Sequence, residues 1–386
     1  MSHLPSSPAE PRKDVREVTP AEARVRQGQG AVLLDVREDD ERASVAEGSL
    51  GVPRGLLPTR AATLVPNLAT PVLLICGSGV RSRLAAATML DMGYRDVASV
   101  AGGLARWSAE GLPRAAGLLD TDAADRYARQ LILPQVGVAG QARLAASKVA
   151  IIGAGGLGAP AMLYLTGAGV GHLTLIDDDR VERSNLHRQV VHADSRIGMA
   201  KVESARAQLL DLNPSISVTA RAERLQAANV QSLIEGHDVV LDGADNFSVR
   251  YLLAAATLRL KIPLVYGAVE RFSGQVSVFD PRRDDSPCYR CLFPQPPAAG
   301  DAPNCSEAGV LGVLPGMIGL LQATEVLKLL LGIGEPLVGR LLTYDALAMR
   351  FRQILLPRDR ACPGCGVDAR FTGYGDVEAF CVHTTT

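Results

Sequence analysis

The stretch KVAIIGAGGLG, at residues 148–158, decides the fold of the larger part of this chain. Its apolar first half is typical of a buried strand, and Gly153, Gly155 and Gly158 form the turn pattern G-x-G-x-x-G directly after it. Asp177 ends the next apolar run, about 20 residues further on. Such a turn lets backbone N–H groups approach a phosphate, and the acidic residue suits a ribose hydroxyl. The pattern predicts a nucleotide site, and it leaves a nicotinamide cofactor and ATP both open.

The next segment supplies cations that favour ATP. SNLHRQ occupies residues 184–189, and GMAK ends at Lys201, so that Arg188 and Lys201 are expected near the glycine turn. Cleavage of a triphosphate needs positive groups to offset the charge that builds on the phosphates. Asp245 and Asn246 follow another apolar run and offer a carboxylate where Mg²⁺ can bridge phosphates.

Further apolar runs continue the same pattern after this turn. Strands are predicted at 172–179, 238–246 and 263–269, with helical segments between them. Strands that alternate with helices indicate an α/β fold with a parallel sheet. The most apolar segment, 309–331, is interrupted by Pro315, Glu325 and Lys328, and we interpret it as a buried helix rather than a membrane span.

A smaller α/β domain is predicted before this one. Its strands are expected at 31–36, 71–76 and 96–100, and its helices at 81–94 and 102–111. The predicted divisions are a disordered N-terminus at 1–15, a first domain at 16–113, a linker at 114–125, a second domain at 126–366 and a tail at 367–386.

In the first domain, Cys76 ends a strand and precedes a glycine-rich loop that leads to Arg81. Backbone N–H groups of such a loop, with a helix N-terminus behind them, stabilise an anion and lower the pKa of the thiol. Cys76 is therefore a candidate nucleophile or sulfur carrier, although half of a disulfide and a small packed residue are also open. By itself the loop fits a phosphatase as well as a sulfurtransferase.

Two further cysteine pairs suggest a metal. Cys288-x-x-Cys291 and Cys362-x-x-Cys365 can place four thiolates at the corners of one structural Zn²⁺ site. Four unrelated thiols, or a redox role for one pair, are the alternatives. Cys305 lies outside both pairs, and it is either a small residue before the 309–331 helix or a reactive thiol. Cys381 has no informative context.

Composition narrows the function classes. The 386 residues carry a net charge of -1, which gives no support for nucleic acid or an anionic membrane surface as a partner. The N-terminus has no apolar run of the kind that secretory signals need. Seven cysteines, four of them in CxxC pairs, suit a reducing compartment, so a cytoplasmic protein is expected.

Several of these motifs, in this order, resemble the MoeB/ThiF family of the ubiquitin-activating superfamily over about 126–366. They are RYARQ (126–130), GAGGLG, Asp177, SNLHRQ, Lys201, DN (245–246), CYRCLFPQP and CPGCG. The resemblance implies a Rossmann-like homodimeric enzyme with a zinc knuckle. It would adenylate the C-terminal glycine of a ubiquitin-like sulfur-carrier protein that ends in Gly-Gly.

The same resemblance implies roles for individual residues. Arg129 would reach the ATP of the partner subunit, and Asp245 would support Mg²⁺ and the adenylation step. The expected ATP-binding residues are Gly153, Gly155, Gly156, Gly158, Asp177, Ser184, Asn185, Arg188, Lys201, Asp245 and Asn246. In sulfurtransferase-linked members, a cysteine matching Cys305 is assigned a covalent role.

The stretch 16–113 resembles a rhodanese domain, through LLDVRE (33–38), CGSGVRS (76–82), VAGGLARW and GLP (111–113). In the resembling families a short loop, like the four residues between Cys76 and Arg81, goes with a persulfide, and a loop one residue longer goes with phosphate. Arg81 would orient the loop, and Asp35 and Arg37 would brace it. In the familiar fusions the rhodanese domain follows the adenylating domain, whereas here it precedes it.

Together these features predict adenylation of a sulfur carrier with ATP and Mg²⁺, followed by sulfur transfer from a Cys76 persulfide. The expected carrier is the small subunit of molybdopterin synthase, and a thiamine, cysteine or siderophore carrier is the alternative. A cysteine desulfurase or thiosulfate would supply the sulfur, and Cys305 could be the thiol that releases the product. An NAD-dependent oxidoreductase with a regulatory rhodanese module, and a non-catalytic docking protein, are the competing functions.

Overall fold

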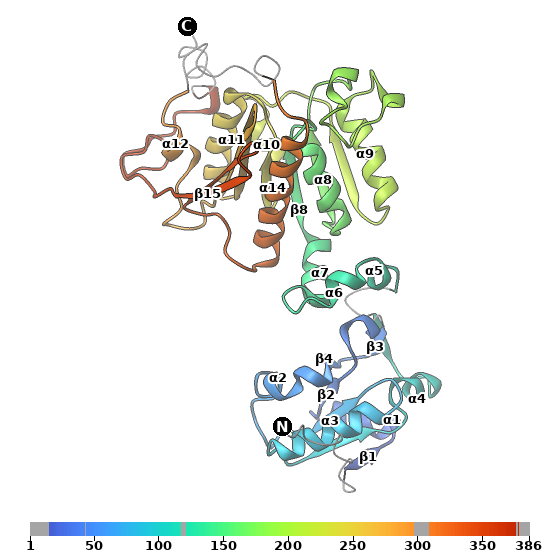
Figure 1. Cartoon of the computed structure of the whole chain (residues 1–386). Helices are drawn as coiled ribbons and strands as arrows, with labels where there is room; N and C mark the ends of the chain where they lie inside the picture. Colours follow the sequence, from blue (N-terminus) through green and yellow to red (C-terminus); the bar gives the residue numbers. More distant parts are fainter. Residues whose placement is uncertain (1–14, 43, 117–120, 297–308, 376, 378–386) are drawn as a thin grey trace, which may run out of the picture. The chain divides into compact units, whose positions relative to one another are not determined.

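The computed structural model describes residues 15–42, 44–116, 121–296, 309–375 and 377. The chain forms two compact units, residues 1–142 and 143–386, which Figure 1 draws in blue to cyan-green and in green to red. Cys305, Cys381 and nearly all of the predicted disordered N-terminus lie outside the described residues. The predicted linker 114–125 lies within the first unit, and the domain boundaries remain a prediction.

A five-stranded parallel sheet, in the order β1-β6-β5-β2-β4, organises the first unit. The predicted strands are present as β2, β5 and β6, and the predicted helices as α3 and α4. The elements of this sheet and its covering helices are β1 (Arg16–Val18), α1 (Pro20–Gly28), β2 (Val32–Asp35), β4 (Leu50–Gly51), α2 (Leu57–Leu64), β5 (Val72–Ile75), α3 (Val80–Asp91), β6 (Val97–Val100) and α4 (Gly103–Ala109).

Two apolar clusters hold this sheet between its helices. One contains residues of α2 and α3, such as Ala61 and Met89, and the other contains residues of α1 and α4, such as Ala23 and Trp107. The central strands β2, β5 and β6 are thus buried on both faces, which is why they consist mostly of apolar residues. The remaining elements of the unit are η1 (Asp39–Glu41), β3 (Ser44–Ala46), η2 (Arg54–Leu56), β7 (Arg114–Ala116), α5 (Thr121–Arg126), α6 (Ala128–Leu131) and α7 (Gly137–Ala146), and α7 runs into the second unit.

The second unit contains an eight-stranded sheet in the order β10-β9-β8-β11-β12-β13-β14-β15. The first five strands are parallel, and the last three are antiparallel. Its strands are β8 (Lys148–Ile152), β9 (His172–Ile176), β10 (Ser217–Arg221), β11 (Val239–Asp242), β12 (Leu264–Glu270), β13 (Ser273–Phe279), β14 (Arg340–Asp345) and β15 (Arg350–Leu355). The strand order reverses direction between β8 and β11, which is where open α/β sheets bind ligands.

Helices connect these strands and cover the sheet. They are α8 (Gly158–Gly167), η3 (Arg183–Asn185), η4 (Asp194–Arg196), α9 (Lys201–Leu212), α10 (Val230–Ile234), α11 (Phe247–Leu260), α12 (Tyr289–Leu292) and α14 (Val313–Leu331). Among the described residues, α14 alone is long and apolar enough to cross a membrane. It packs instead on α8 and on β11 to β13, as a core helix does (Figure 1).

The predicted helix 309–331 begins only at Val313, because the preceding residues pair with another segment. Val310 forms a β-bridge with Arg271, and the Leu311 N–H donates to the Arg271 carbonyl. The α/β fold with parallel sheets is confirmed in both units. The antiparallel strands β13 to β15 were not predicted, and neither was the packing of Tyr374, in the predicted tail, against the core of the second unit.

Candidate nucleotide pocket, cysteine loop and zinc centre

A cavity of about 1120 Å³ opens at the carboxyl ends of β8, β9 and β11 in the second unit. Its wall contains nine of the eleven residues predicted to bind ATP, and they come from five separate segments. These nine residues are Gly153, Gly155, Gly156, Asp177, Asn185, Arg188, Lys201, Asp245 and Asn246. The fold therefore gathers at one point residues that are spread over about a quarter of the chain.

Gly153 and Gly158 make the glycine turn possible for steric reasons. Gly153 has a φ of +93°, and a Cβ there would lie 2.6 Å from the carbonyl oxygen of Gly243. A Cβ on Gly158 would lie only 2.0 Å from the carbonyl oxygen of Gly153. Gly158 is buried at the start of α8 and does not line the cavity, so its role is to let the turn close.

Asp177 connects the end of β9 to this turn. Its Oδ2 accepts the Ala154 N–H at 2.7 Å, and its Oδ1 accepts the Asp179 N–H at 2.8 Å. Burial raises the pKa of Asp177, while the nearby Lys201 and these two N–H groups oppose the rise. Each carboxylate oxygen of Asp177 thus accepts one backbone N–H group. Each also keeps a lone pair that can accept a hydrogen bond from a ribose hydroxyl.

Lys201 and Arg188 provide the positive charge in the cavity wall. The Lys201 side chain is only 6% exposed, and its ammonium donates to Asp179 Oδ2 at 2.7 Å. Arg188 donates to Asn185 Oδ1 at 3.0 Å and also contacts the Ser184 carbonyl and the His187 ring. Ser184 itself is exposed and does not line the cavity. Both cations can therefore reach a polyanion without leaving the wall.

Asp245 and Asn246 follow the end of β11, and their side chains make different hydrogen bonds. The Asn246 side-chain oxygen accepts the Val249 N–H at 3.0 Å and so caps α11. Within the part of the chain that the structure describes, the Asp245 carboxylate accepts a single long hydrogen bond, 3.4 Å, from the Asn246 side-chain amide. This carboxylate lies beside a predicted phosphate site and is free of strong hydrogen bonds from the described residues. It can therefore serve as one of the oxygen ligands that Mg²⁺ requires.

Sequence reasoning missed the buried ion pair of this wall. Arg250 lines the cavity from the first turns of α11, with its Nε 3.5 Å from Asp242 Oδ2 and its guanidinium over the Tyr266 ring. Burial raises the pKa of Asp242 to about 6, and the charge of Arg250 opposes the rise. The sequence did contain a signal for this pair, which is an arginine inside the apolar segment 247–260. A buried cation needs an acidic partner, so Arg250 could have indicated a buried ion pair.

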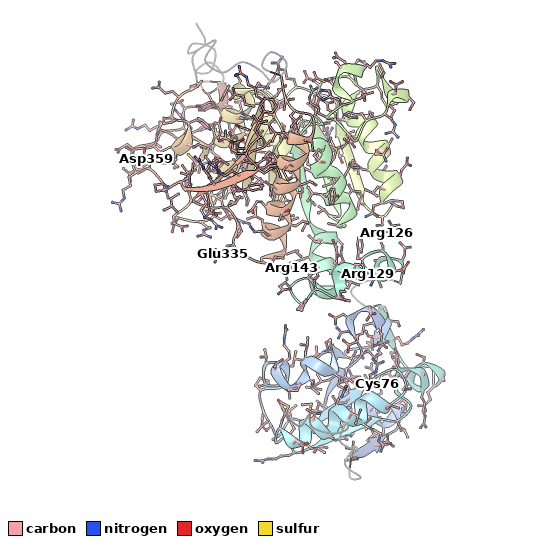
Figure 2. All side chains as sticks on the ribbon, in the orientation of Figure 1. Cys76, Arg126, Arg129, Arg143, Glu335 and Asp359 are labelled. Atoms are coloured by element: carbon pink, nitrogen blue, oxygen red, sulfur yellow. The ribbon has the colours of Figure 1, made fainter. Side chains whose placement is uncertain are left out.

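Arg129 lies on α6 of the first unit and is exposed there (Figure 2).

Cys76 lies in the core of the first unit, at the end of β5, and only 1% of it is exposed (Figure 2). Its sulfur accepts the Gly79 N–H at 3.1 Å and lies 3.5 Å from Ser82 Oγ, which also receives a hydrogen bond from Ser99. Burial raises the pKa of this thiol, but hydrogen bonds from Ser82, Gly79 and Ser78 outweigh it, so that the pKa is lowered overall. The loop thus favours a thiolate.

The segment VAGGLARW, at residues 100–107, packs against the Cys76 loop. The Leu104 N–H donates to the Cys76 carbonyl at 2.7 Å, and a Cβ on Gly103 would lie 2.3 Å from that same oxygen. The glycines of VAGGLARW therefore allow α4 to pack directly under the loop. Asp35 and Arg37 form a buried ion pair at 2.7 Å, and the role expected for them in bracing the loop stays a prediction.

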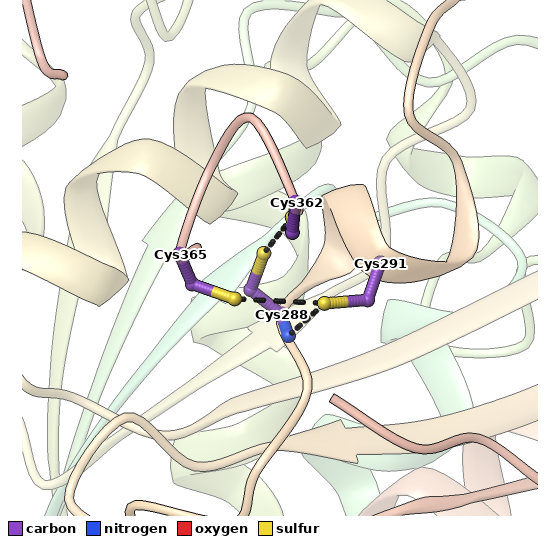
Figure 3. A group of neighbouring side chains, drawn as sticks. All are labelled: Cys288, Cys291, Cys362 and Cys365. Carbon is purple, nitrogen blue, oxygen red and sulfur yellow. Dashed lines mark hydrogen bonds between the residues drawn. The ribbon is translucent and has the colours of Figure 1, made fainter. Parts of the chain in front are cut away.

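The four paired cysteines converge in the second unit, as Figure 3 shows. Cys288 and Cys362 have their sulfurs 3.6 Å apart, and Cys291 and Cys365 have theirs 3.5 Å apart. Four sulfurs around a tetrahedral Zn²⁺ would be separated by roughly 3.8 Å, given Zn–S bonds of about 2.3 Å. Backbone N–H groups of Cys288 and Gly364 also point at sulfurs of the cluster. The residues present therefore fit a closed structural zinc site.

Comparisons with known proteins agree with this geometry. The model of the ThiF family matches residues 127–365, and the model of the rhodanese-like domain matches residues 19–110. Solved structures show the same fold. E. coli MccB with ATP has a TM-score of 0.56 at 22% identity, covering 63% of this chain and 74% of that one. PaaA has a TM-score of 0.54 at 23% identity, covering 66% and 81%.

Curated relatives are closer in sequence. A SAMP-activating enzyme E1 from Haloferax volcanii is 51% identical over 64% of this chain and 91% of its own length. A sulfur carrier protein adenylyltransferase from Thermus thermophilus is 49% identical over 67% of this chain and 96% of its own length. The adenylyltransferase and sulfurtransferase MOCS3 of Drosophila grimshawi is 47% identical over 69% of this chain and 60% of its own length. The chain therefore belongs to the ThiF family, and a rhodanese-like domain precedes its ThiF domain, as the motifs predicted.

Proposed function

We propose that this protein activates the C-terminal carboxylate of a ubiquitin-like sulfur-carrier protein with ATP and then replaces the activated oxygen with sulfur. The observation that carries the proposal is the cavity between β8 and β11, where a glycine turn, Lys201 and Arg188 converge. The names of the relatives, which include adenylyltransferases and sulfurtransferases, support the same two activities. The match to the ThiF family speaks against a dehydrogenase and against a purely docking role.

In the first half-reaction, the carrier carboxylate attacks the α-phosphorus of ATP, giving an acyl-adenylate and pyrophosphate. The glycine turn presents backbone N–H groups to the phosphates, and Lys201 and Arg188 offset the charge that grows on them. Asp245 would hold Mg²⁺, which neutralises phosphate charge when it is bound. Arg129 would enter the site of the partner subunit in a homodimer.

In the second half-reaction, the outer sulfur of a Cys76 persulfide attacks the activated carbonyl and AMP leaves. The product is an acyl disulfide between the carrier and Cys76. A second thiol then attacks the Cys76 sulfur and forms a disulfide with it, which releases the carrier as a thiocarboxylate. Cys305 is our candidate for that thiol. The lowered pKa of Cys76 increases the fraction of its thiolate form, which is the form that takes up sulfur from a donor.

The carrier that we propose is the small subunit of molybdopterin synthase, and carriers of thiamine, cysteine or siderophore pathways are the alternative. We also propose a cytoplasmic location. None of the five described cysteines forms a disulfide, which suits a reducing compartment.

ATP–pyrophosphate exchange that depends on a Gly-Gly-ended carrier tests the first half-reaction. Lys201→Met should lower the exchange rate by on the order of 10²–10³-fold, because it removes a preorganised cation from the phosphate site. Lys148→Met is the matched control, since Lys148 is exposed at the opposite end of β8. Absence of exchange with every such carrier would end the proposal.

Cys76→Ala tests the second half-reaction. The variant should retain the exchange activity of the wild type and lose thiocarboxylate formation, because adenylation takes place in the other unit. Thiocarboxylate can be measured by the mass of the carrier. An unchanged yield would mean that sulfur reaches the carrier by another route.

A further inference from the structure

Ser99 is the polar residue of β6, and the other three residues of this strand are apolar. Its side chain is fully buried. Successive side chains of a strand point to opposite faces, so Ser99 shares a face with Val97, which packs in the apolar cluster of α2 and α3. A hydroxyl in such surroundings costs free energy unless it forms a hydrogen bond. Its presence therefore calls for a reason other than packing.

The partner of Ser99 is Ser82, which lies in the first turn of α3 and is also fully buried. Ser99 Oγ donates to Ser82 Oγ at 2.9 Å. In the part of the chain that the structure describes, this is the single hydrogen bond of the Ser99 side chain. A serine hydroxyl has one proton, so the proton of Ser99 points at Ser82 and the proton of Ser82 must point elsewhere.

The Ser82 proton can point at either of two acceptors. One is the Gly79 carbonyl oxygen at 3.0 Å, and the other is Cys76 Sγ at 3.5 Å. The Gly79 carbonyl also accepts the Arg83 N–H at 3.3 Å, so it keeps a donor when the Ser82 hydroxyl rotates toward the sulfur. When Cys76 loses its proton, this rotation adds a second donor to the Gly79 N–H that already points at Sγ.

We propose that Ser99 is a positioning residue of the cysteine loop, whose hydroxyl polarises that of Ser82 toward Cys76 Sγ and so favours the thiolate. The inference rests on the proposed sulfurtransferase role of Cys76. A hydroxyl that accepts a hydrogen bond donates a stronger one, because the bonds of a chain polarise one another. The chain from Ser99 through Ser82 to Cys76 lies in the core, where the low dielectric strengthens each bond.

The charged groups around the loop are the same in every variant that tests this proposal. The elements packed around the loop carry three ion pairs, which are Asp35–Arg37, Glu41–Arg81 and Arg106–Glu110. Glu38 adds a further negative charge near Arg81. Strands β5 and β6 contain no charged residue. A change in the titration of Cys76 between hydroxyl variants therefore reports the serine chain and not the charges.

The test is the pH dependence of the alkylation of Cys76 by iodoacetamide in the full-length protein, followed by the mass of the peptide that contains Cys76. Ser99→Ala should lower the rate by about threefold at pH values where Cys76 is mostly a thiol, since it weakens a hydrogen bond to a charged group. At high pH, where Cys76 is fully a thiolate, the rate should not change. Ser82→Ala removes that bond outright and should lower the rate at low pH by about tenfold. The double variant should match Ser82→Ala, because Ser99 acts through Ser82.

Two further variants separate this role from packing. Ser99→Thr keeps the hydroxyl and should keep the wild-type profile. Thr88→Val removes a hydroxyl of α3 that donates to the Leu84 carbonyl instead of the loop, and it should also leave the profile unchanged. Fluorescence of Trp107, in the core of the same unit, verifies that each variant is folded.

A Ser99→Ala profile that coincides with the wild-type profile would overturn the role of Ser99. A folded Ser99→Thr protein with the profile of Ser99→Ala would do the same, and so would a double variant whose loss is the product of the two single losses. Thiocarboxylate formation tests the proposed function separately. If the wild-type protein forms none on an adenylated carrier, sulfur transfer by Cys76 falls, while the alkylation profiles still decide the role of Ser99.

Discussion

Gly158→Ala should destabilise the second unit and weaken ATP binding at the same time. The new Cβ would lie 2.0 Å from the Gly153 carbonyl oxygen, whereas real Cβ contacts to backbone are longer than 3.0 Å. The turn or the start of α8 must therefore move by about 1 Å. Overpacking of this kind costs about 1–3 kcal/mol of folding free energy. Loss of one N–H bond to a charged phosphate weakens ATP binding by about tenfold or more.

Gly155→Ala is the matched comparison in the same turn. Gly155 has no positive φ, and its Cβ would meet only Gln189 Nε2, at an ordinary distance of 3.7 Å. Stability should change by less than about 0.5 kcal/mol. Gly155 does line the cavity, so its methyl group would hold the phosphates away from the backbone and reduce ATP affinity. The two variants thus separate folding from binding.

Urea denaturation followed by circular dichroism measures the stability, and calorimetry measures ATP affinity. Trp107, the single tryptophan, lies in the core of the first unit, so its fluorescence provides an internal reference that should not shift. A Gly158→Ala protein with wild-type stability and wild-type affinity would refute the steric argument. Unchanged ATP affinity in Gly155→Ala would show that this wall does not face the phosphates.

Three other perturbations have defined outcomes. Ser82→Ala should raise the pKa of Cys76 measured by the pH dependence of alkylation, because it removes the strongest of the hydrogen bonds that lower it. Removal of zinc by a chelator, or Cys362→Ser, should lower the thermal midpoint of the second unit, because the four sulfurs join segments 288–291 and 362–365. Asp242 has a pKa of about 6 in the folded protein against 3.8 ordinarily, so it stabilises the fold most below pH 3.8 and loses that contribution as the pH rises through about 6. Asp242→Asn should remove this part of the slope of stability against pH.

Each of these outcomes has a clear opposite. An alkylation profile unchanged by Ser82→Ala would mean that backbone N–H groups alone set the thiol pKa. A thermal midpoint unaffected by chelation, in a protein shown to lose its metal, would contradict a structural zinc. A stability slope between pH 4 and pH 7 that is identical in Asp242→Asn and wild type would assign that slope to other groups.

Local sequence patterns were sufficient to predict the positions of the central strands and to identify the motif residues. Strands β2, β5, β8 and β11 are continuous apolar runs because both faces of the parallel sheets are covered by helices. The glycine turn could be recognised because its spacing follows from steric limits that act within a few residues. The two CxxC pairs could be recognised because tetrahedral ligation constrains each pair locally.

The antiparallel half of the second sheet could not be predicted in this way. Strand β15 is exposed along its whole length and, among the described strands, pairs only with β14, so no buried period marks it in the sequence. The late start of α14 depends on the bridge between Val310 and Arg271, which is a contact between segments far apart in the chain. Partners of this kind are decided by the fold and not by the neighbouring residues.

The sequence by itself determined two α/β units, a glycine turn, a cysteine loop and four cysteines that can hold zinc, because short-range sterics and ligand spacing act along the chain. Only the tertiary structure decided which charges face each other. It placed Asp242 against Arg250 in the cavity wall and Glu41 against Arg81 beside Cys76. Electrostatic partners depend on distance in space, and burial determines how strongly they interact.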